Sequence, residues 1–255
     1  MRIASLGSGS RGNGTLIEDG DTRLLVDLGF SIKDTTARLH RLGCMPQDVS
    51  AVLVTHEHAD HISGVIAFAE KFAIPVYMSA GTYYSRRDKL NSEVVRFSSH
   101  RTFSIGSLNV EPVPVPHDAR EPCQFVFSAG GHRVGLLTDI GHITPHVVDR
   151  YHQLDVLMLE CNYDPNMLSS GPYPFKLKQR VAGSYGHLSN LQAAELVSGM
   201  DCSALGHVVV SHISEKNNLP ELAMSAVNEA LGHWHGDLLL SDQDCGFDWL
   251  SVGAD

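Results

Sequence analysis

Short apolar runs, separated by polar and glycine-containing stretches, follow one another along most of the chain. Runs of this kind, bounded by turn residues, predict buried β-strands. The predicted strands cover residues 2–6, 14–18, 23–28, 51–55, 75–78, 94–97, 107–115, 124–128, 133–138, 156–160, 208–210 and 238–240. Asp19-Gly20-Asp21 and Gly130-Gly131 each separate two consecutive runs and predict hairpin turns.

Helical spacing is present between several of these runs. In residues 62–72 apolar side chains recur at every third or fourth position, from Ile62 to Phe72, which predicts an amphipathic helix. The predicted helices cover residues 32–42, 62–72, 145–151, 191–198 and 220–231. The chain is βαβ-like in places and antiparallel in others, in two comparable halves. This order favours an α/β (α+β) fold of two mixed sheets packed face to face, with helices on both outer faces.

Pro112, Pro114 and Pro116 alternate along one predicted strand, so the three missing amides face the same side. A central strand cannot lose three hydrogen-bond donors, and we therefore expect this strand at the edge of its sheet. No linker rich in Pro, Gly or Ser divides the sequence, which predicts a single domain over residues 1–255.

The composition is that of an ordinary globular protein, with 43% hydrophobic and 19% charged residues. Disorder, a collagen-like chain and a coiled coil are excluded. No stretch approaches the roughly 20 apolar residues of a membrane span, and the first residues lack the apolar block of a signal peptide. The five cysteines lie far apart without a CxxC pair, which predicts reduced thiols and a cytoplasmic protein.

The 15 histidines are the unusual feature, and the segment from His56 to His61 (HEHADH) concentrates them. Residues two apart in an extended segment point the same way, so His56 and His58 can hold one metal ion. The turn into the following helix would bring Asp60 and His61 to a second ion. Imidazole nitrogens and carboxylate oxygens suit Zn²⁺, Mn²⁺ or Fe. The alternative interpretation is a solvated polar loop.

Further ligands are expected at the ends of other strands. His117 ends the proline-rich strand, Asp139 follows a buried apolar strand, and His212 follows another. A buried, unpaired carboxylate at Asp139 would be costly, whereas a metal bridge would stabilise it. Each residue taken alone is equally compatible with a hydrogen-bonded strand terminus. Together with the histidine segment they supply seven ligands for two ions.

Two residues are expected to support this centre. Asp27 ends the run LeuLeuValAsp and is a candidate for orienting a ligand histidine, with capping of a turn as the alternative. His187 stands just before a predicted helix and is a candidate general acid, with a surface or capping histidine as the alternative.

This ligand pattern resembles the metallo-β-lactamase-fold hydrolase superfamily over essentially the whole chain. Residues 5–13, 24–31, 54–61, 186–190 and 212–218 are similar to the YycJ (WalJ) family of DNA exonucleases within it. The resemblance implies a four-layer αββα sandwich and a nuclease that hydrolyses phosphodiesters, 5′→3′ on double-stranded DNA, with a link to mismatch repair and DNA-repair partners. At Tyr163 the chain departs from the histidine expected there.

The resemblance also implies roles for single residues. His56, His58 and His117 would hold the first metal, and Asp60, His61 and His212 the second, with Asp139 bridging them. His187 would protonate the leaving group. A hydroxide shared by two ions about 3.5–4 Å apart would attack the phosphorus, and Asp60 would orient or deprotonate the nucleophile.

Substrate contacts are expected around the metals only, because the formal net charge of −10 argues against an extended DNA grip. The tentative contacts are Ser10, Asn13, Lys178, Arg180 and Asn190. Basic residues at 86–89 (Arg86, Arg87 and Lys89) and 176–180 could meet phosphates, with solvated turns as the alternative.

Two other functions stay open. A hydrolase of the same fold could act on thioesters, lactones or small cyclic phosphodiesters, since the metals alone do not decide the substrate. A metal-binding regulatory module without catalysis is the second. It would be expected to have lost ligands, whereas all seven positions and His187 hold competent residues. The sequence leaves the oligomeric state undetermined and indicates no membrane partner.

Overall fold

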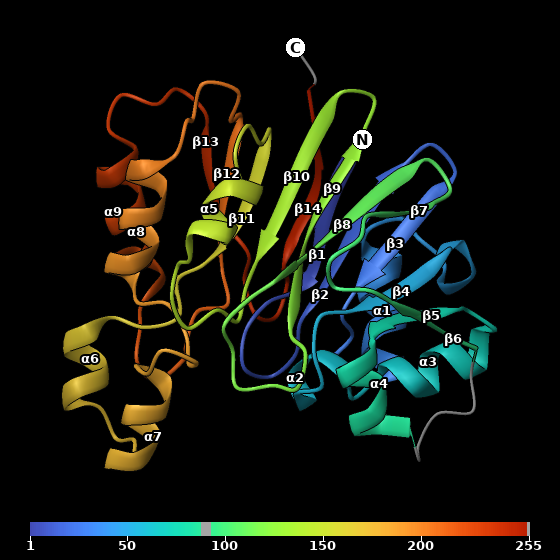
Figure 1. Cartoon of the computed structure of the whole chain (residues 1–255), viewed down its shortest axis with the longest axis horizontal. Helices are drawn as coiled ribbons and strands as arrows, with labels where there is room; N and C mark the ends of the chain where they lie inside the picture. The colour runs from blue at the N-terminus through green and yellow to red at the C-terminus, as the bar shows by residue number, and fades with distance from the viewer. Residues whose placement is uncertain (88–92, 254–255) are drawn as a thin grey trace.

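The computed structural model describes residues 1–87 and 93–253 (Figure 1). The strands of the first sheet are β1 Arg2–Gly7, β2 Gly14–Asp19, β3 Thr22–Val26, β4 Ala51–Val54, β5 Val76–Ser79, β6 Val94–Phe97 and β14 Phe247–Ser251. Those of the second are β7 Phe103–Ile105, β8 Leu108–Pro114, β9 Cys123–Ala129, β10 His132–Leu137, β11 Val156–Glu160, β12 His207–Ser211 and β13 Asp237–Leu240. The order is β14-β1-β2-β3-β4-β5-β6 in the first sheet and β13-β12-β11-β10-β9-β8-β7 in the second.

Both sheets are mixed. In the first, β3 to β6 are parallel, and in the second β10 to β13 are parallel. Strands β8 and β10 are both antiparallel to β9 and therefore run in the same direction as each other. The carboxyl ends of β8, β10, β11 and β12 consequently lie at one edge of their sheet, which is where α/β proteins place their sites.

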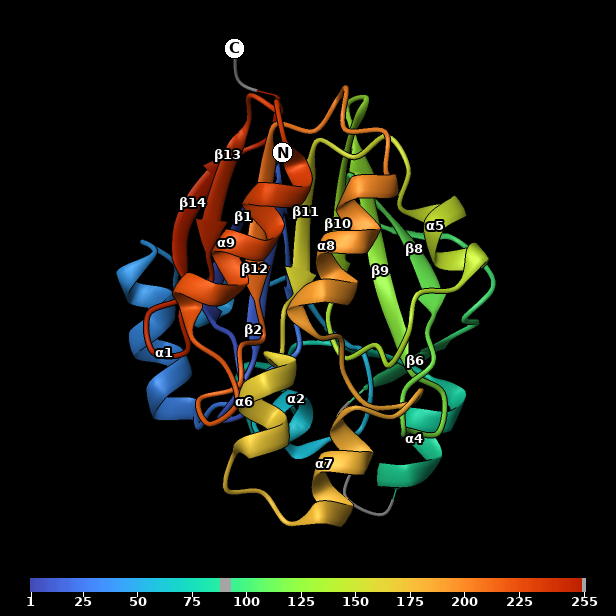
Figure 2. The same cartoon turned by 90° about the vertical axis from the view of Figure 1, so that its left-hand side faces the viewer.

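The helices are α1 Ile32–Arg41, α2 Ala59–Ile62, α3 Val65–Phe72, α4 Ala80–Arg86, α5 Pro145–Arg150, α6 Pro165–Ser170, α7 Phe175–Val181, α8 Asn190–Gly199 and α9 Pro220–Leu231, and Pro46–Asp48 form a 3₁₀ turn. Figure 2 shows α8 and α9 in front of the second sheet, while α1 and α3 cover the outer face of the first. Both views place α6 and α7 beyond the lower edge of the sheets, on the side of α2 (Figures 1 and 2).

Three buried clusters follow from this layering. The side chains between the sheets, among them Phe125 and Phe127, form one cluster, and each outer sheet face packs with its helices in another. The predicted αββα sandwich is thereby confirmed. No helix within the described residues is long and apolar enough to cross a membrane.

The predicted helix at 62–72 is wrong as a single element, because the chain forms α2 and α3 with a break at Ser63-Gly64. The backbone bonds explain the break. The Asp60 carbonyl accepts from Asn13 N at 2.8 Å, and Gly64 N donates to the Leu28 carbonyl at 2.8 Å, so neither group continues the helix. A side chain at Gly64 would meet the Phe30 carbonyl at 2.0 Å, which explains the glycine.

The proline-rich strand β8 is not the edge strand, because β7 lies outside it. However, β7 pairs only with the first three residues of β8, up to Val110, and Pro112 and Pro114 pair with β9 alone. The prolines, which have no N–H to donate, thus lie where β8 has no neighbouring strand on its β7 side. The prediction of an edge strand rested on this same requirement, that no hydrogen bond is lost. Helices α4, α6 and α7 and strands β7 and β14 were not predicted.

Candidate metal centre

The histidine and aspartate side chains singled out in the sequence meet at one edge of the two sheets. His56 and His58 follow β4, and Asp60 and His61 lie on α2. The segment stays extended up to His58, which has φ −64° and ψ 149°, and then turns into the helix. The other side chains come from loops that follow strands of the second sheet running in the same direction: His117 after β8, Asp139 after β10 and His212 after β12.

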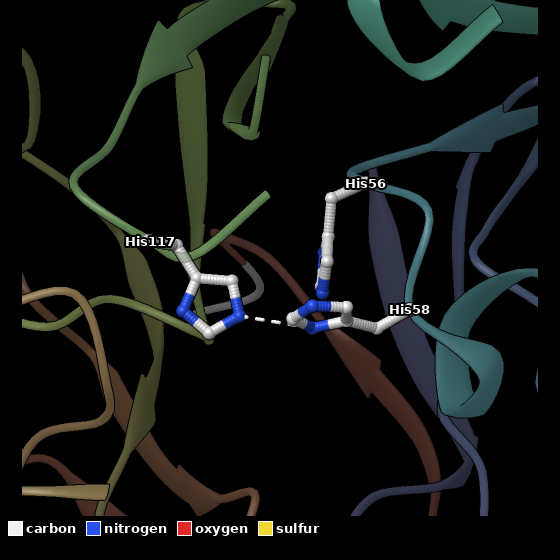
Figure 3. A group of neighbouring side chains, drawn as sticks. All are labelled: His56, His58 and His117. Atoms are coloured by element: carbon white, nitrogen blue, oxygen red, sulfur yellow. Dashed lines mark hydrogen bonds between the residues drawn. The ribbon is translucent and has the colours of Figure 1, made fainter. Parts of the chain in front are cut away.

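The first group consists of His56, His58 and His117 (Figure 3). Their ligand atoms all lie within 4.8 Å of one another, and His117 Nε2 is 3.2 Å from His58 Nδ1. The three rings come from two separate segments and point to a common centre (Figure 3). Within the described residues, the buried His56 Nε2 has no hydrogen-bond partner.

The second group consists of Asp60, His61 and His212, and Asp139 lies beside it. His61 Nε2 is 3.4 Å from Asp60 Oδ2 and 3.0 Å from Asp139 Oδ2. His212 Nε2 lies 3.6 Å from the same oxygen of each carboxylate. Asp139 also approaches the first group, since its Oδ1 is 3.8 Å from His117 Nε2. One carboxylate therefore lies between the two groups.

These atoms fit divalent metal ions. His56 Nε2 is buried and has no hydrogen-bond partner among the residues that the structure describes, while His212 Nε2 and Asp139 Oδ2 are buried beside other candidate ligands. Buried polar atoms of this kind cost roughly 1–3 kcal/mol each unless another group satisfies them. Nitrogen and carboxylate oxygen without thiolate form a donor set for Zn²⁺, Mn²⁺ or Fe.

Hydrogen bonds behind the ligands hold their rings in place. Asp27 Oδ2 accepts from His61 Nδ1 at 2.8 Å and from the Thr55 hydroxyl at 2.8 Å. The same hydroxyl lies 2.9 Å from His56 Nδ1, and Thr55 N donates to Asp27 Oδ1 at 2.8 Å. Asp27 thus contacts His61 directly and His56 through Thr55, and both Nε2 atoms face the centre, as metal ligation requires.

Glu160 is a further buried carboxylate of the centre that the sequence pattern alone did not single out. It ends β11, is 0% exposed, and its Oε1 lies 2.6 Å from His187 Nδ1 and 3.2 Å from His212 Nδ1. Its other oxygen accepts from Ile140 N at 3.1 Å. The signal was present: Glu160 follows a buried apolar run, as Asp139 does.

His187 enters the centre from the loop before α8. Burial alone would lower the pKa of His187, but the Glu160 carboxylate outweighs it and raises that pKa above its ordinary value. The Glu160 contact is made by Nδ1, which leaves Nε2 as the ring nitrogen available to a substrate.

The two groups differ in charge before any metal binds. Burial lowers the pKa of His56 and of His117, so both rings are neutral at pH 7. Burial has the same tendency at His212, but Asp139, Asp60 and Glu160 raise the pKa of His212 to about 10. The pKa of His61 is likewise raised, against the effect of burial, by Asp139, Asp60 and Asp27. The second group is therefore internally ion-paired in the metal-free protein.

A cavity of about 310 Å³ opens in front of these groups. It is lined by His58, Asp60, Asp139, His187 and His212 on the metal side, by Tyr173, Leu177, Arg180 and Val181 of the α7 segment, and by Ser10, Asn162 and Ser214. Arg180 forms an ion pair with Asp118, whose Oδ1 is 3.6 Å from His58 Nε2.

Of the five residues proposed to contact the substrate, some line this cavity and others do not. Ser10 and Arg180 line the cavity. Asn13 is buried and holds the loop before β2, with its Nδ2 3.1 Å from His61 Nε2. Asn190 is buried and exchanges amide hydrogen bonds with Asn218. The Lys178 ammonium donates to the Ser169 carbonyl at 2.6 Å. Asn13, Lys178 and Asn190 are not among the residues that line the cavity.

The predicted basic group at 86–89 is described only in part. Arg86 donates to the Glu57 carbonyl and so packs against the histidine segment, whereas Lys89 lies outside the described residues.

Comparison with known proteins gives consistent results. The family model described as "Beta-lactamase superfamily domain" matches residues 22–213. Exodeoxyribonuclease WalJ of Streptococcus pneumoniae is 34% identical over 238 residues, which cover 90% of this chain and 88% of that protein. Exodeoxyribonuclease YycJ of Bacillus anthracis is 32% identical over 235 residues, 91% of this chain and 89% of that protein. The metallo-β-lactamase fold protein YhfI from Bacillus subtilis superposes with a TM-score of 0.76 at 16% identity, covering 98% of this chain and 99% of that one.

Proposed function

Because this chain belongs to the beta-lactamase superfamily, and within it to the family of the exodeoxyribonucleases WalJ and YycJ, it is a metal-dependent phosphodiester hydrolase, and we propose that it degrades double-stranded DNA from the 5′ end. The observation that carries the proposal is the pair of ligand groups beside Asp139, both opening into one cavity. We assign one divalent ion, Zn²⁺ or Mn²⁺, to each group.

When bound there, two such ions would supply Lewis-acid chemistry, which makes water a better nucleophile and neutralises the oxygens of a phosphodiester. The residues of the chain do the rest. His56, His58 and His117 would hold the first ion, Asp60, His61 and His212 the second, and Asp139 would contact both. Asp60 lines the cavity and is 25% exposed, so its carboxylate can orient the attacking water by accepting a hydrogen bond from it.

His187 would donate the proton that the departing sugar oxygen needs. Its raised pKa keeps the ring protonated closer to neutral pH, and its Nδ1–H bond to Glu160 fixes its orientation. Glu160 acts here as a positioning residue, because it contacts the ring and lies 0% exposed behind it.

Digestion of a DNA duplex labelled at the 5′ or the 3′ end, with Mn²⁺, tests the proposal. We expect wild type to release mononucleotides from the 5′ end, and Asp60→Ala to release none. Asp149→Ala is the matched control, because its carboxylate is 71% exposed and belongs to α5. Release from the 3′ end would overturn the polarity. Intact duplex with metal bound, beside turnover of a cyclic phosphodiester, a thioester or a lactone, would overturn the nuclease assignment.

The biological setting is also part of the proposal. We propose a role in DNA mismatch repair, a cytoplasmic location and a single domain over residues 1–255. The family resemblance supports the role in mismatch repair. The free thiols, of which Cys44, Cys123 and Cys161 are buried, support the cytoplasmic location. A raised spontaneous mutation rate after loss of the gene, restored by wild type and not by Asp60→Ala, would support the repair role, and an unchanged rate would contradict it.

A further inference from the structure

The cavity in front of the metal centre has an apolar side that hydrolysis of a phosphate does not require. Tyr173 and two side chains of α7, Leu177 and Val181, form it. We propose that this side is a nucleobase subsite, in which the ring of Tyr173 stacks on the base of the nucleotide that is being removed. The inference rests on the proposed nuclease function, because it takes the substrate to be a nucleotide chain.

The apolar side is held firmly in place. Leu177 and Val181 are four residues apart on α7 and therefore share one helix face. Val181 is buried in a cluster with Tyr163 and Leu168, and Tyr173 and Leu177 pack against that cluster. The backbone N–H of His187 donates to the Val181 carbonyl at 2.9 Å. The α7 segment is thus fixed relative to the residue proposed to protonate the leaving group.

The position of the ligand groups leaves this side for the base. Metal ions held by Asp60, Asp139 and His212 would place the phosphate at the polar side of a cavity of about 310 Å³, which leaves the side toward α7 for the sugar and base. Every base has an apolar π-face, and aromatic side chains stack on it with little regard to sequence. Such a subsite suits an enzyme that removes any nucleotide in turn.

The ion pair between Arg180 and Asp118 favours a chain end as the occupant. Arg180 belongs to α7 and Asp118 to the loop after β8, and both line the cavity. Their contact connects the two sides of the cavity. A continuous strand passing between α7 and this loop would have to break the ion pair, whereas a terminal nucleotide would not.

Removing the ring and the base separately, and then together, tests the contact between them. We expect Tyr173→Ala to raise KM for duplex DNA about 5- to 150-fold, the range measured for single base–aromatic stacks, with kcat nearly unchanged. Tyr173→Phe should stay within about twofold of wild type. Phe175→Ala is the matched control, because this ring lies two residues further along the chain, at the start of α7, is 73% exposed and is not among the residues that line the cavity.

The same variants are then assayed on a duplex whose terminal nucleotide is abasic. On this substrate the KM of wild type should rise by the same factor by which Tyr173→Ala raised KM on the intact duplex. The KM of Tyr173→Ala should rise no further. If the ring and the base act independently, so that both losses multiply, the stacking assignment is overturned. An equal loss in Phe175→Ala would overturn it as well, because the effect would then belong to α7 as a whole.

Binding of 2-aminopurine deoxynucleoside 5′-monophosphate, whose fluorescence is quenched by stacking, provides a readout without turnover. We expect quenching with wild type and Tyr173→Phe and none with Tyr173→Ala at equal metal content. Absence of DNA hydrolysis by wild type would refute the proposed function, whereas absence of quenching with active wild type would refute only the subsite.

Discussion

Replacing Thr55 by valine removes one hydroxyl from the metal centre and keeps the shape of the side chain. That hydroxyl is the link between Asp27 and His56, at 2.8 Å from the first and 2.9 Å from the second. The bond from Thr55 N to Asp27 Oδ1 and the bond between His61 and Asp27 do not involve it. The substitution therefore frees the ring of His56 in the first ligand group and leaves His61 in the second group held.

The expected magnitude follows from these contacts. His56 is 0% exposed, so its Nδ1 would be left buried and unpaired, at a cost of about 1–3 kcal/mol. Loss of a partner that orients a ligand histidine usually weakens metal affinity or activity about 10- to 100-fold. We expect a loss of this size for the first ion and a change of less than about threefold for the second.

Metal titration against a chelator, followed by stoichiometry, measures both affinities. Thr55→Ser keeps the hydroxyl and should therefore bind the first ion with the affinity of wild type. Thr35→Val is the matched control: this threonine is also buried, and its hydroxyl donates to the Ser31 carbonyl at 2.8 Å, in α1. The control should change the free energy of unfolding without changing metal binding. Because His56→Ala already removes the ring that the Thr55 hydroxyl contacts, adding Thr55→Val to it should weaken metal binding no further. Equal loss at both sites, or unchanged affinity at the first, would refute the reasoning.

Three further predictions concern the proton chemistry of the centre. His187→Ala should keep its metal content and lose about 10²- to 10⁴-fold in kcat, the usual range for a general acid, and a kcat equal to wild type would remove His187 from the mechanism. Glu160 raises the pKa of His187, so Glu160→Gln should lower it and move the alkaline limb of the pH–rate profile to lower pH; an unmoved limb would show that the contact does not set the titration. His212 has a pKa of about 10 in the metal-free protein and must lose its proton to bind a metal, so metal affinity should rise with pH by up to about tenfold per unit for each proton released. Calorimetry in buffers of different ionisation enthalpy measures the released protons, and a value of zero would contradict the ion-paired state of the second group.

The sequence was sufficient for the parts of the fold that depend on local pattern. Strands β4, β10, β11 and β12 are buried on both faces and read as continuous apolar runs, and polar residues directly after them mark the ends of parallel strands. That rule placed Asp139 and His212 correctly beside the histidine segment. Applied consistently, it would also have found Glu160, which ends β11.

The parts that could not be predicted depend on tertiary contacts. The break at Gly64 arises because Leu28 and Asn13, distant in sequence, take the helical hydrogen bonds of α2. Asn190 was taken for a substrate contact, but the structure pairs it with Asn218, a residue 28 positions away. The apolar side of the cavity was also missed, because short helices such as α7 carry little periodic signal and become stable by packing.

The backbone itself shows why these particular strand ends form a centre. Asp27, Asp139 and His212 all have positive φ, of 59°, 50° and 52°, although none is a glycine. A left-handed residue costs about 1–2 kcal/mol, so three of them at one edge are expensive unless other contacts determine them. Each follows the end of a strand, where the left-handed turn ends the alternation of side chains and directs one polar group out of the sheet. Asp27 is held there by Thr55 and His61, and His212 by the hydroxyl of Ser8, which accepts from its N–H at 3.0 Å. The strain is therefore the structural cost of directing two ligands, Asp139 and His212, and the residue that orients His61 from three strand ends to one centre. Replacing any of the three by glycine would relax the strain but would also remove the side chain that the centre needs.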